Sequence, residues 1–194
     1  MNNLIESNNI CNDDNRSADN DIDSDLDNDN NRYTYLLSLL EKCQQLKNEY
    51  YLDFSKQSFV TPKNRRDLFK WYSSHFKHGS FHADVIALSM SLVDAVLSRY
   101  DMVNIHNFSI VAHTCLWISC KFVYDDSSFH LASQILEYCD EKVVTINELV
   151  ECESIIFDIS TNILGAPTIV HIAEEICKLL NADGTQIKGF ILGV

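Results

Sequence analysis

The stretch HNFSIVAHTCLWISCKFVY, residues 106–124, is apolar on nearly every side. Its small residues Ala112, Cys115 and Ser119 form one stripe, while larger apolar side chains occupy the other sides. A helix that is apolar all round is enclosed by its neighbours. A stripe of small residues lets another helix axis approach closely. We therefore expect these residues to form a central helix with the other helices packed around it.

Two charged side chains interrupt this apolar pattern. Lys121 lies on the side of the central helix that carries Thr114 and Trp117, and Glu153 lies in residues 146–160, away from the expected core stripe of that helix. Each residue alone is explained by a solvated position, because a lysine stem extends along apolar surface while its ammonium group reaches water. Together they favour a partner surface, since an exposed apolar patch containing a few charges is typical of one.

Helical periodicity continues through the rest of the chain from Tyr33 onward. Helical segments are predicted at residues 33–52, 61–77, 81–100, 130–139, 145–160 and 168–180. Thr61 followed by Pro62 is typical of a helix start, and Thr145 with Glu148 three residues later forms a capping-box pattern. No segment shows the two-residue alternation of a strand. The sequence therefore predicts an all-α fold.

Residues 1–31 differ sharply in composition from the remainder. They are dominated by Asn and Asp and carry a net charge of −8, out of −13 for the whole chain. A segment with so little to bury is expected to be disordered. The acidic balance argues against nucleic-acid binding, which requires a basic face. We see no signal peptide and no continuous apolar run long enough to span a membrane, so we expect no membrane association and an intracellular protein, in the nucleus, the cytoplasm or both.

Catalytic and metal-binding patterns are weak. The seven cysteines are an odd number without a CxxC pair, as expected of reduced thiols. His75, His78 and His82 cluster without fitting acidic or cysteine companions, so we expect no metal site and no cofactor. His113 and Cys115 lie in the central helix, where a thiol is usually inert. There is no glycine-rich phosphate loop. We therefore expect that the chain is not an enzyme.

Four motifs resemble the cyclin box, the five-helix module of the cyclins, over about residues 60–169. The family's first-helix motif M-R-A-I-L-x-x-W resembles NRRDLFKW, with Arg65, Leu68 and Trp71 in place, and its Y-I-D-R-F-L resembles LVDAVL, with Asp94. The resemblance implies a five-helix box around a central helix. It divides the chain into the tail (1–31), an N-terminal helix (32–56), the box (57–169) and a C-terminal helical extension (170–194) where a second repeat would begin.

The other two motifs contain the charged residues. The family's A-S-K-F-E-E resembles ISCKFVYDD, with Lys121 and with Ile110 eleven residues earlier, and its M-E-x-x-I-L-x-x-L followed by A-P-T resembles CESIIFDISTNILGAPT, with Glu153 and Pro167. The resemblance implies that the chain binds and activates a cyclin-dependent protein kinase as a heterodimer. Lys121 and Glu153 would bond to backbone groups at the start of the mobile C-helix of the kinase.

The resemblance also assigns the residues around these anchors. The apolar seat for the C-helix would consist of Ile118, Phe122, Phe157 and Leu164. Arg65 and Asp94 would form an internal structural pair between the first two helices of the box.

One departure from the family pattern and two alternative functions bear on the assignment. Asn64 replaces the methionine that, in cyclins, helps to line a groove for substrate docking motifs, so we expect no docking there. The chain could instead be a cyclin-fold transcription adaptor resembling the core of general transcription factor IIB, which would need a basic surface. It could also be a cyclin-like protein that binds a kinase without activating it.

Overall fold

The computed structural model describes residues 18–77, 82–101, 103–124, 135 and 144–180 of the 194-residue chain. All regular structure in these residues is helical, as predicted. The elements are α1 (Ala18–Glu49), the short 3₁₀ helix η1 (Phe54–Lys56), α2 (Pro62–Lys77), α3 (Ala83–Arg99), α4 (Ile105–Val123), α6 (Ile146–Leu164) and α7 (Ile169–Leu179). The helix predicted at residues 130–139 lies, apart from Ile135, outside the described residues.

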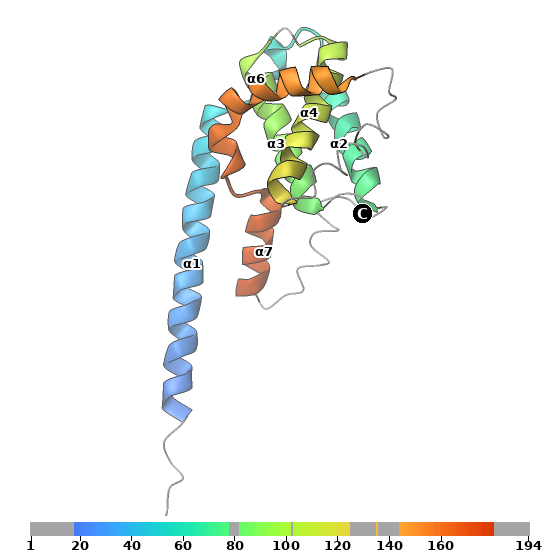
Figure 1. Ribbon diagram of the computed structural model, residues 1–194. Helices are drawn as coiled ribbons and strands as arrows, with labels where there is room; N and C mark the ends of the chain where they lie inside the picture. The colour runs from blue at the N-terminus through green and yellow to red at the C-terminus, as the bar shows by residue number, and fades with distance from the viewer. Residues whose placement is uncertain (1–17, 78–81, 102, 125–134, 136–143, 181–194) are drawn as a thin grey trace, which may run out of the picture.

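Helix α4 is the central helix, as its composition predicts. It packs against α3 and α6, and its small residues Ala112, Cys115 and Ser119 are each at most 2% exposed. The buried hydroxyl of Tyr72 in α2 donates a hydrogen bond of 2.7 Å to the carbonyl oxygen of Ala112. Figure 1 shows α4 and α3 side by side, with α2 and α6 around them. The small stripe therefore serves close helix packing.

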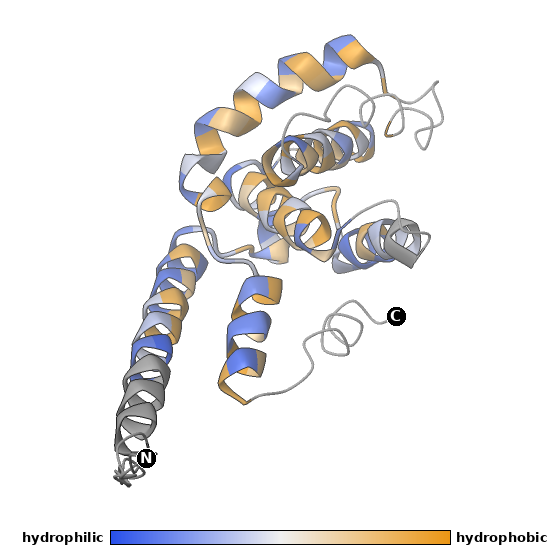
Figure 2. Ribbon diagram, turned by 60° about the horizontal axis from the view of Figure 1, so that its bottom comes forward, coloured by the Kyte–Doolittle hydropathy of each residue, from blue (hydrophilic) through white to orange (hydrophobic). Residues whose placement is uncertain are grey.

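The core consists of two hydrophobic clusters that meet along α3 and α4. The first joins the C-terminal part of α3 to the N-terminal part of α4 and the inner face of α6. The second joins α2 and the start of α3 to the C-terminal part of α4, and includes Ile135 and Val170. The inner face of α6 contains Leu149, Ile156, Ile159 and Ile163. In Figure 2, hydrophobic residues recur at intervals along α6, as expected for an amphipathic helix.

Local capping fixes the starts of α2 and α6. In α6 the Thr145 hydroxyl accepts a hydrogen bond from the Glu148 amide, and the Glu148 carboxylate accepts one from the Thr145 amide, which confirms the predicted capping box. At α2 the Asn64 side chain accepts hydrogen bonds from both the amide and the hydroxyl of Thr61. Asn64 therefore closes the helix start at the position where the cyclin motif has methionine.

Helix α1 begins earlier than the sequence predicts. The expected N-terminal helix covers residues 32–56, whereas α1 starts at Ala18 and ends at Glu49. Residues 18–31, within the segment for which the sequence predicts disorder, thus form the first part of α1; residues 1–17 lie outside the described part. Extending an established helix costs far less than nucleating one, so the packed half around Leu36 and Leu39 can carry a polar extension. Figure 1 shows this end of α1 extending away from the other helices.

Helix α7 lies beside α1 and follows a turn after α6. The Lys42 ammonium of α1 donates a hydrogen bond of 2.9 Å to the carbonyl oxygen of Gly165 in this turn. By length and composition alone, the segment Ile146–Leu179 qualifies as a candidate membrane span, with a mean hydropathy of 1.4 over 18 residues. The core helix of a soluble protein passes the same test, and α6 buries its inner face in the domain core. About a third of that window (33%) is buried in the domain, and a single such segment is weak evidence for a membrane span.

Candidate functional site

The structure brings Lys121 and Glu153 together on adjacent helices. The Lys121 ammonium, near the end of α4, lies 2.7 Å from Glu153 Oε1 and 2.9 Å from Oε2 in α6. The side chains are 38% and 19% exposed, respectively, so the pair is at the surface and partly desolvated. A carboxylate has about four lone-pair sites, and Glu153 therefore keeps acceptor capacity for another group.

Trp117 completes this polar cluster. Its indole Nε1 donates a hydrogen bond of 3.3 Å to Glu153 Oε2, and the Lys121 ammonium lies 4.6 Å from the centre of its ring. Both contacts hold the two charged groups in a defined orientation. The sequence places Trp117 four residues before Lys121, on the same helix face, and the structure brings it into contact with both charged groups.

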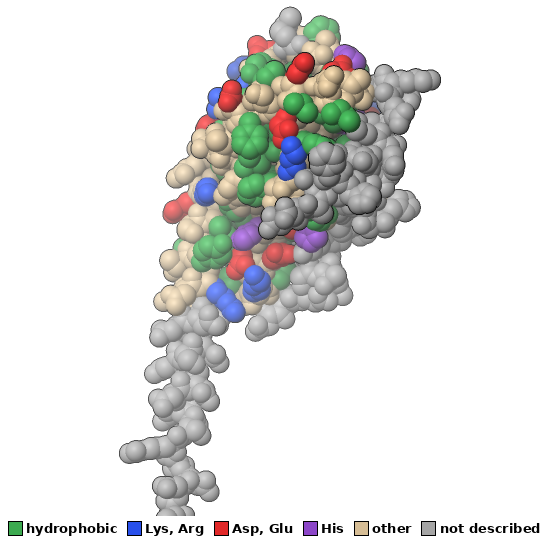
Figure 3. Space-filling view, viewed as in Figure 1, with side chains coloured by type: hydrophobic (Ala, Val, Ile, Leu, Met, Phe, Trp, Pro, Cys, Tyr) green, Lys and Arg blue, Asp and Glu red, His purple; other side chains and the backbone are tan. Residues whose placement is uncertain are grey.

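Large apolar side chains surround the pair. Phe122 in α4 is 57% exposed, and Phe157, one helical turn after Glu153 in α6, is 48% exposed. Ile146 and Val150 on the same face of α6 are 58% and 54% exposed. In Figure 3, hydrophobic side chains gather around adjoining acidic and basic groups on the face that α4 and α6 form. Such exposure of large apolar groups around a charged pair is typical of an interaction surface.

Two members of the expected apolar seat are placed differently. Ile118 is 2% exposed and belongs to the first core cluster, so its assignment to the contact surface is corrected. It supports Phe122 from within the domain, because residues four apart on a helix are neighbours. Leu164, the last residue of α6, is half-buried against the same cluster. Only its outer part is accessible.

Arg65 and Asp94 form the internal pair that the resemblance implies. Arg65 Nε and Nη2 each lie 2.6 Å from a different carboxylate oxygen of Asp94, which links α2 to α3. The hydrogen bonds to Asp94 raise the pKa of the Arg65 guanidinium despite its partial burial. The pair is separate from the Lys121 cluster and joins two helices within the domain. Its geometry is that of a structural link.

The thiols of the central helix are poor nucleophiles. Burial raises the pKa of Cys115 well above its usual value and that of Cys120 to about 12. Such thiols stay protonated at neutral pH, and the thiolate is the reactive form. In the part of the chain that the structure describes, no group of three or more His, Cys, Asp or Glu side chains is placed to hold a metal ion. Of the histidine cluster, His82 caps α3 and lies 2.8 Å from Asp84.

Comparison with known protein families identifies the class that this fold and surface define. Residues 32–159 match the model of the cyclin N-terminal domain. Because the match covers well over half of the chain, the chain belongs to the cyclin family. Cyclins are regulatory rather than catalytic proteins. No curated protein and no solved structure matches the chain.

Proposed function

We propose that this chain is a regulatory subunit that binds a cyclin-dependent protein kinase as a heterodimer and activates it by positioning its C-helix. The observation that carries the proposal is the Lys121–Glu153 pair, set at the surface between exposed Phe122 and Phe157. Membership of the cyclin family supports a regulatory role. The chemistry of the surface suits the start of a helix, and this supports the proposal that it binds the C-helix of the kinase.

The two charges complement a helix start. The first amides of a helix lack intrahelical partners and carry a partial positive charge, so they are natural donors to the Glu153 carboxylate. The Lys121 ammonium donates to carbonyl oxygens that precede the helix. Hydrogen bonds to charged groups contribute about 1.5 to 3 kcal/mol each. Aromatic residues dominate binding hot spots, and Phe122 and Phe157 would provide that apolar contact.

Positioning of the C-helix is one of the requirements for an active protein kinase. A protein kinase needs the glutamate of its C-helix paired with the lysine that holds the ATP phosphates. A partner that holds this helix in place therefore promotes catalysis without taking part in the chemistry. The chain needs no reactive side chain for such a role.

The proposal is tested with the Lys121→Ala, Glu153→Ala double variant and a co-purified cyclin-dependent kinase. We expect the variant to remain folded by circular dichroism and to lose at least about 90% of the activation, since two charge-assisted contacts are removed. The matched control is Glu175→Ala with Lys178→Ala, which removes the ion pair of α7 between the exposed Lys178 and the largely buried Glu175 and is expected to activate normally. Equal activation by the test variant and the wild type would refute the assignment of Lys121 and Glu153 to the kinase contact. Binding of the kinase by the wild type without activation would favour a cyclin-like protein that does not activate its kinase.

The proposed location is intracellular, in the nucleus, the cytoplasm or both. The cysteines Cys43, Cys115, Cys120, Cys152 and Cys177 are all free thiols. Free thiols are typical of reducing compartments. Microscopy of a fluorescent fusion tests this location, and secretion into the medium would contradict it.

A further inference from the structure

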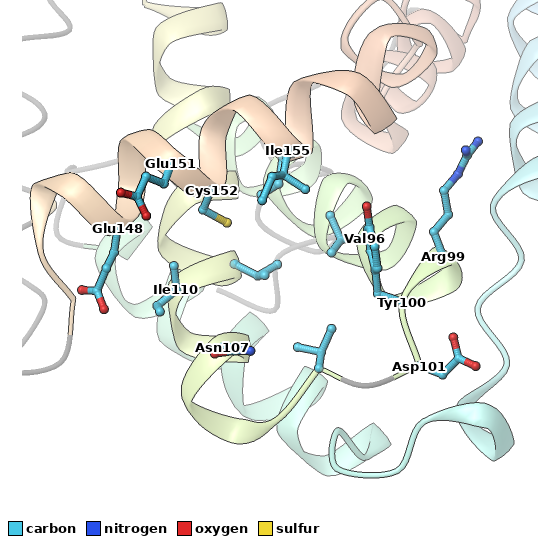
Figure 4. Close-up of a pocket in the computed structure, with 13 residues that line it drawn as sticks. Val96, Arg99, Tyr100, Asp101, Asn107, Ile110, Glu148, Glu151, Cys152 and Ile155 are labelled. Atoms are coloured by element: carbon cyan, nitrogen blue, oxygen red, sulfur yellow. The ribbon is translucent and has the colours of Figure 1, made fainter.

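A groove lies on the other flank of α6. It has a volume of about 500 Å³ and runs between α6, the N-terminal half of α4 and the C-terminal end of α3 (Figure 4). Its lining is mainly apolar and includes Val96, Val103, Ile110, Cys152, Ile155 and Ile156. The volume falls within the usual range of binding sites, roughly 300 to 1,000 Å³.

The groove is distinct from the surface around Lys121. At 100° per residue, Glu151 and Ile155 each lie about 160° around α6 from Glu153. None of the residues that form the charged pair or its aromatic surroundings lines the groove. Nor does Asn64, which occupies the position of the methionine that helps to line the docking groove of cyclins. Two partners could therefore occupy the two flanks of α6 at once.

The charge of the rim is mainly negative. Among the described residues that line the groove, Asp101, Glu148 and Glu151 are acidic and Arg99 is the one basic residue. The Arg99 guanidinium is already engaged, because it lies 3.3 Å from Glu49 and 5.1 Å from the centre of the Tyr50 ring.

Two of the three rim carboxylates are available to a partner. Within the described residues, the side chains of Asp101 and Glu151 have neither a hydrogen-bond nor an ion-pair partner. Figure 4 shows Glu148 and Glu151 at one end of the groove and Asp101 at the other. An occupant is therefore offered uncompensated negative charge at both ends of an apolar floor.

We propose that this groove docks a short segment of another protein in which aliphatic side chains are flanked by lysine or arginine. Aliphatic side chains would fill the apolar floor, and basic groups would pair with Glu151 and Asp101. Charge complementarity of this kind selects partners and speeds their encounter. An apolar centre with a charged rim is the usual anatomy of a protein interface. The inference goes beyond kinase activation and does not depend on it.

The test measures binding of a fluorescein-labelled probe, Gly-Lys-Arg-Leu-Val-Leu-Lys-Arg-Gly, to the full chain by fluorescence anisotropy. We expect saturable binding that Glu151→Lys and Ile155→Ser each weaken about tenfold, since each removes one side of the complementarity. The matched control is Asp67→Lys, an equal charge change at an exposed residue of α2 that does not line the groove. It is expected to change the affinity less than about twofold.

Two further controls separate groove binding from other effects. A second peptide, with serine in place of leucine and valine, measures attraction to the acidic tail and is expected to bind at least about tenfold more weakly. Lys121→Ala is expected to leave probe binding unchanged, so a failure of kinase activation does not affect this result. The proposal is overturned by absence of binding at about 1 mM probe, by equal binding of the serine peptide, or by equal effects of Glu151→Lys and Asp67→Lys.

Discussion

The guanidinium of Arg65 meets the carboxylate of Asp94 through two hydrogen bonds of 2.6 Å. Substituting either residue by alanine leaves a half-buried charge without its partner. We expect each single substitution to lower the free energy of unfolding by about 2 kcal/mol, less than for a fully buried pair. Urea denaturation of both single variants and the double variant gives the coupling energy, expected at about 1 kcal/mol. Strictly additive losses would contradict a structural link.

His113 makes stability depend on pH. The imidazole of His113, on α4, is largely buried against the ring of Trp71, and this burial lowers its pKa from 6.5. The 2.7 Å hydrogen bond to the Ser109 carbonyl oxygen has the opposite, smaller effect on the pKa. The unfolded chain therefore binds a proton at higher pH than the folded chain does. This contribution to stability is fully present above pH 6.5 and is lost as the pH falls towards the folded pKa.

The measurement compares urea unfolding at pH 7.5 and 5.5 for the wild type and His113→Gln. We expect the wild type to lose more stability than the variant over this interval, because glutamine has no proton to bind. Equal losses in the two proteins would show that His113 is not responsible.

Residue-scale exposure was predictable only in part. The resemblance to the cyclin box placed Phe122 and Ile118 on the same contact surface. Phe122 lies one residue before the end of α4 and is exposed, whereas Ile118 is buried in the first core cluster. In a helix that is apolar all round, periodicity cannot separate the two sides. Which side of α4 is buried depends on where α6 packs against it, and that packing is set by contacts between residues distant in the sequence.

At the scale of elements, the capping box of α6 carries a local prediction. Thr145→Ala removes the hydroxyl that accepts the Glu148 amide hydrogen bond. We expect a loss of about 1 kcal/mol in the free energy of unfolding. The control is Thr161→Ala at an exposed position within α6, expected to be neutral or slightly stabilising because alanine has the higher helix propensity. Equal effects of the two substitutions in thermal denaturation would contradict the capping role.

Helix starts fixed by capping residues close in sequence were predictable. The start of a helix that continues from a packed part into a polar segment was not. Thr61 with Pro62 and Thr145 with Glu148 gave the starts of α2 and α6, because each cap involves residues close in sequence. The start of α1 at Ala18 was missed, since composition alone does not show that a packed helix continues into a polar segment.

The groove on the far flank of α6 was also missed. It forms only where the end of α3 meets α4 and α6, and no motif within one of these helices indicates it.

At the scale of the whole molecule, one central helix serves both stability and the proposed function. The small residues of α4 allow close packing by α3 and α6, and that packing places Lys121 2.7 Å from Glu153. Periodicity alone predicted the central helix. The prediction that Lys121 and Glu153 act together at one site came from the resemblance to the cyclin box. The domain therefore presents a charged pair whose geometry depends on the core beneath it.

The central claim is that the Lys121–Glu153 pair binds the start of the kinase C-helix. The most direct test measures kinase activation by the charge-swapped variant Lys121→Glu with Glu153→Lys. The swap retains an ion pair between α4 and α6, so we expect a folded protein with nearly wild-type thermal stability. It reverses the charges offered to the partner's helix start, and activation is expected to fall at least about tenfold. Loss of activation in a folded variant is the predicted result. Activation equal to that of the wild type would contradict the account.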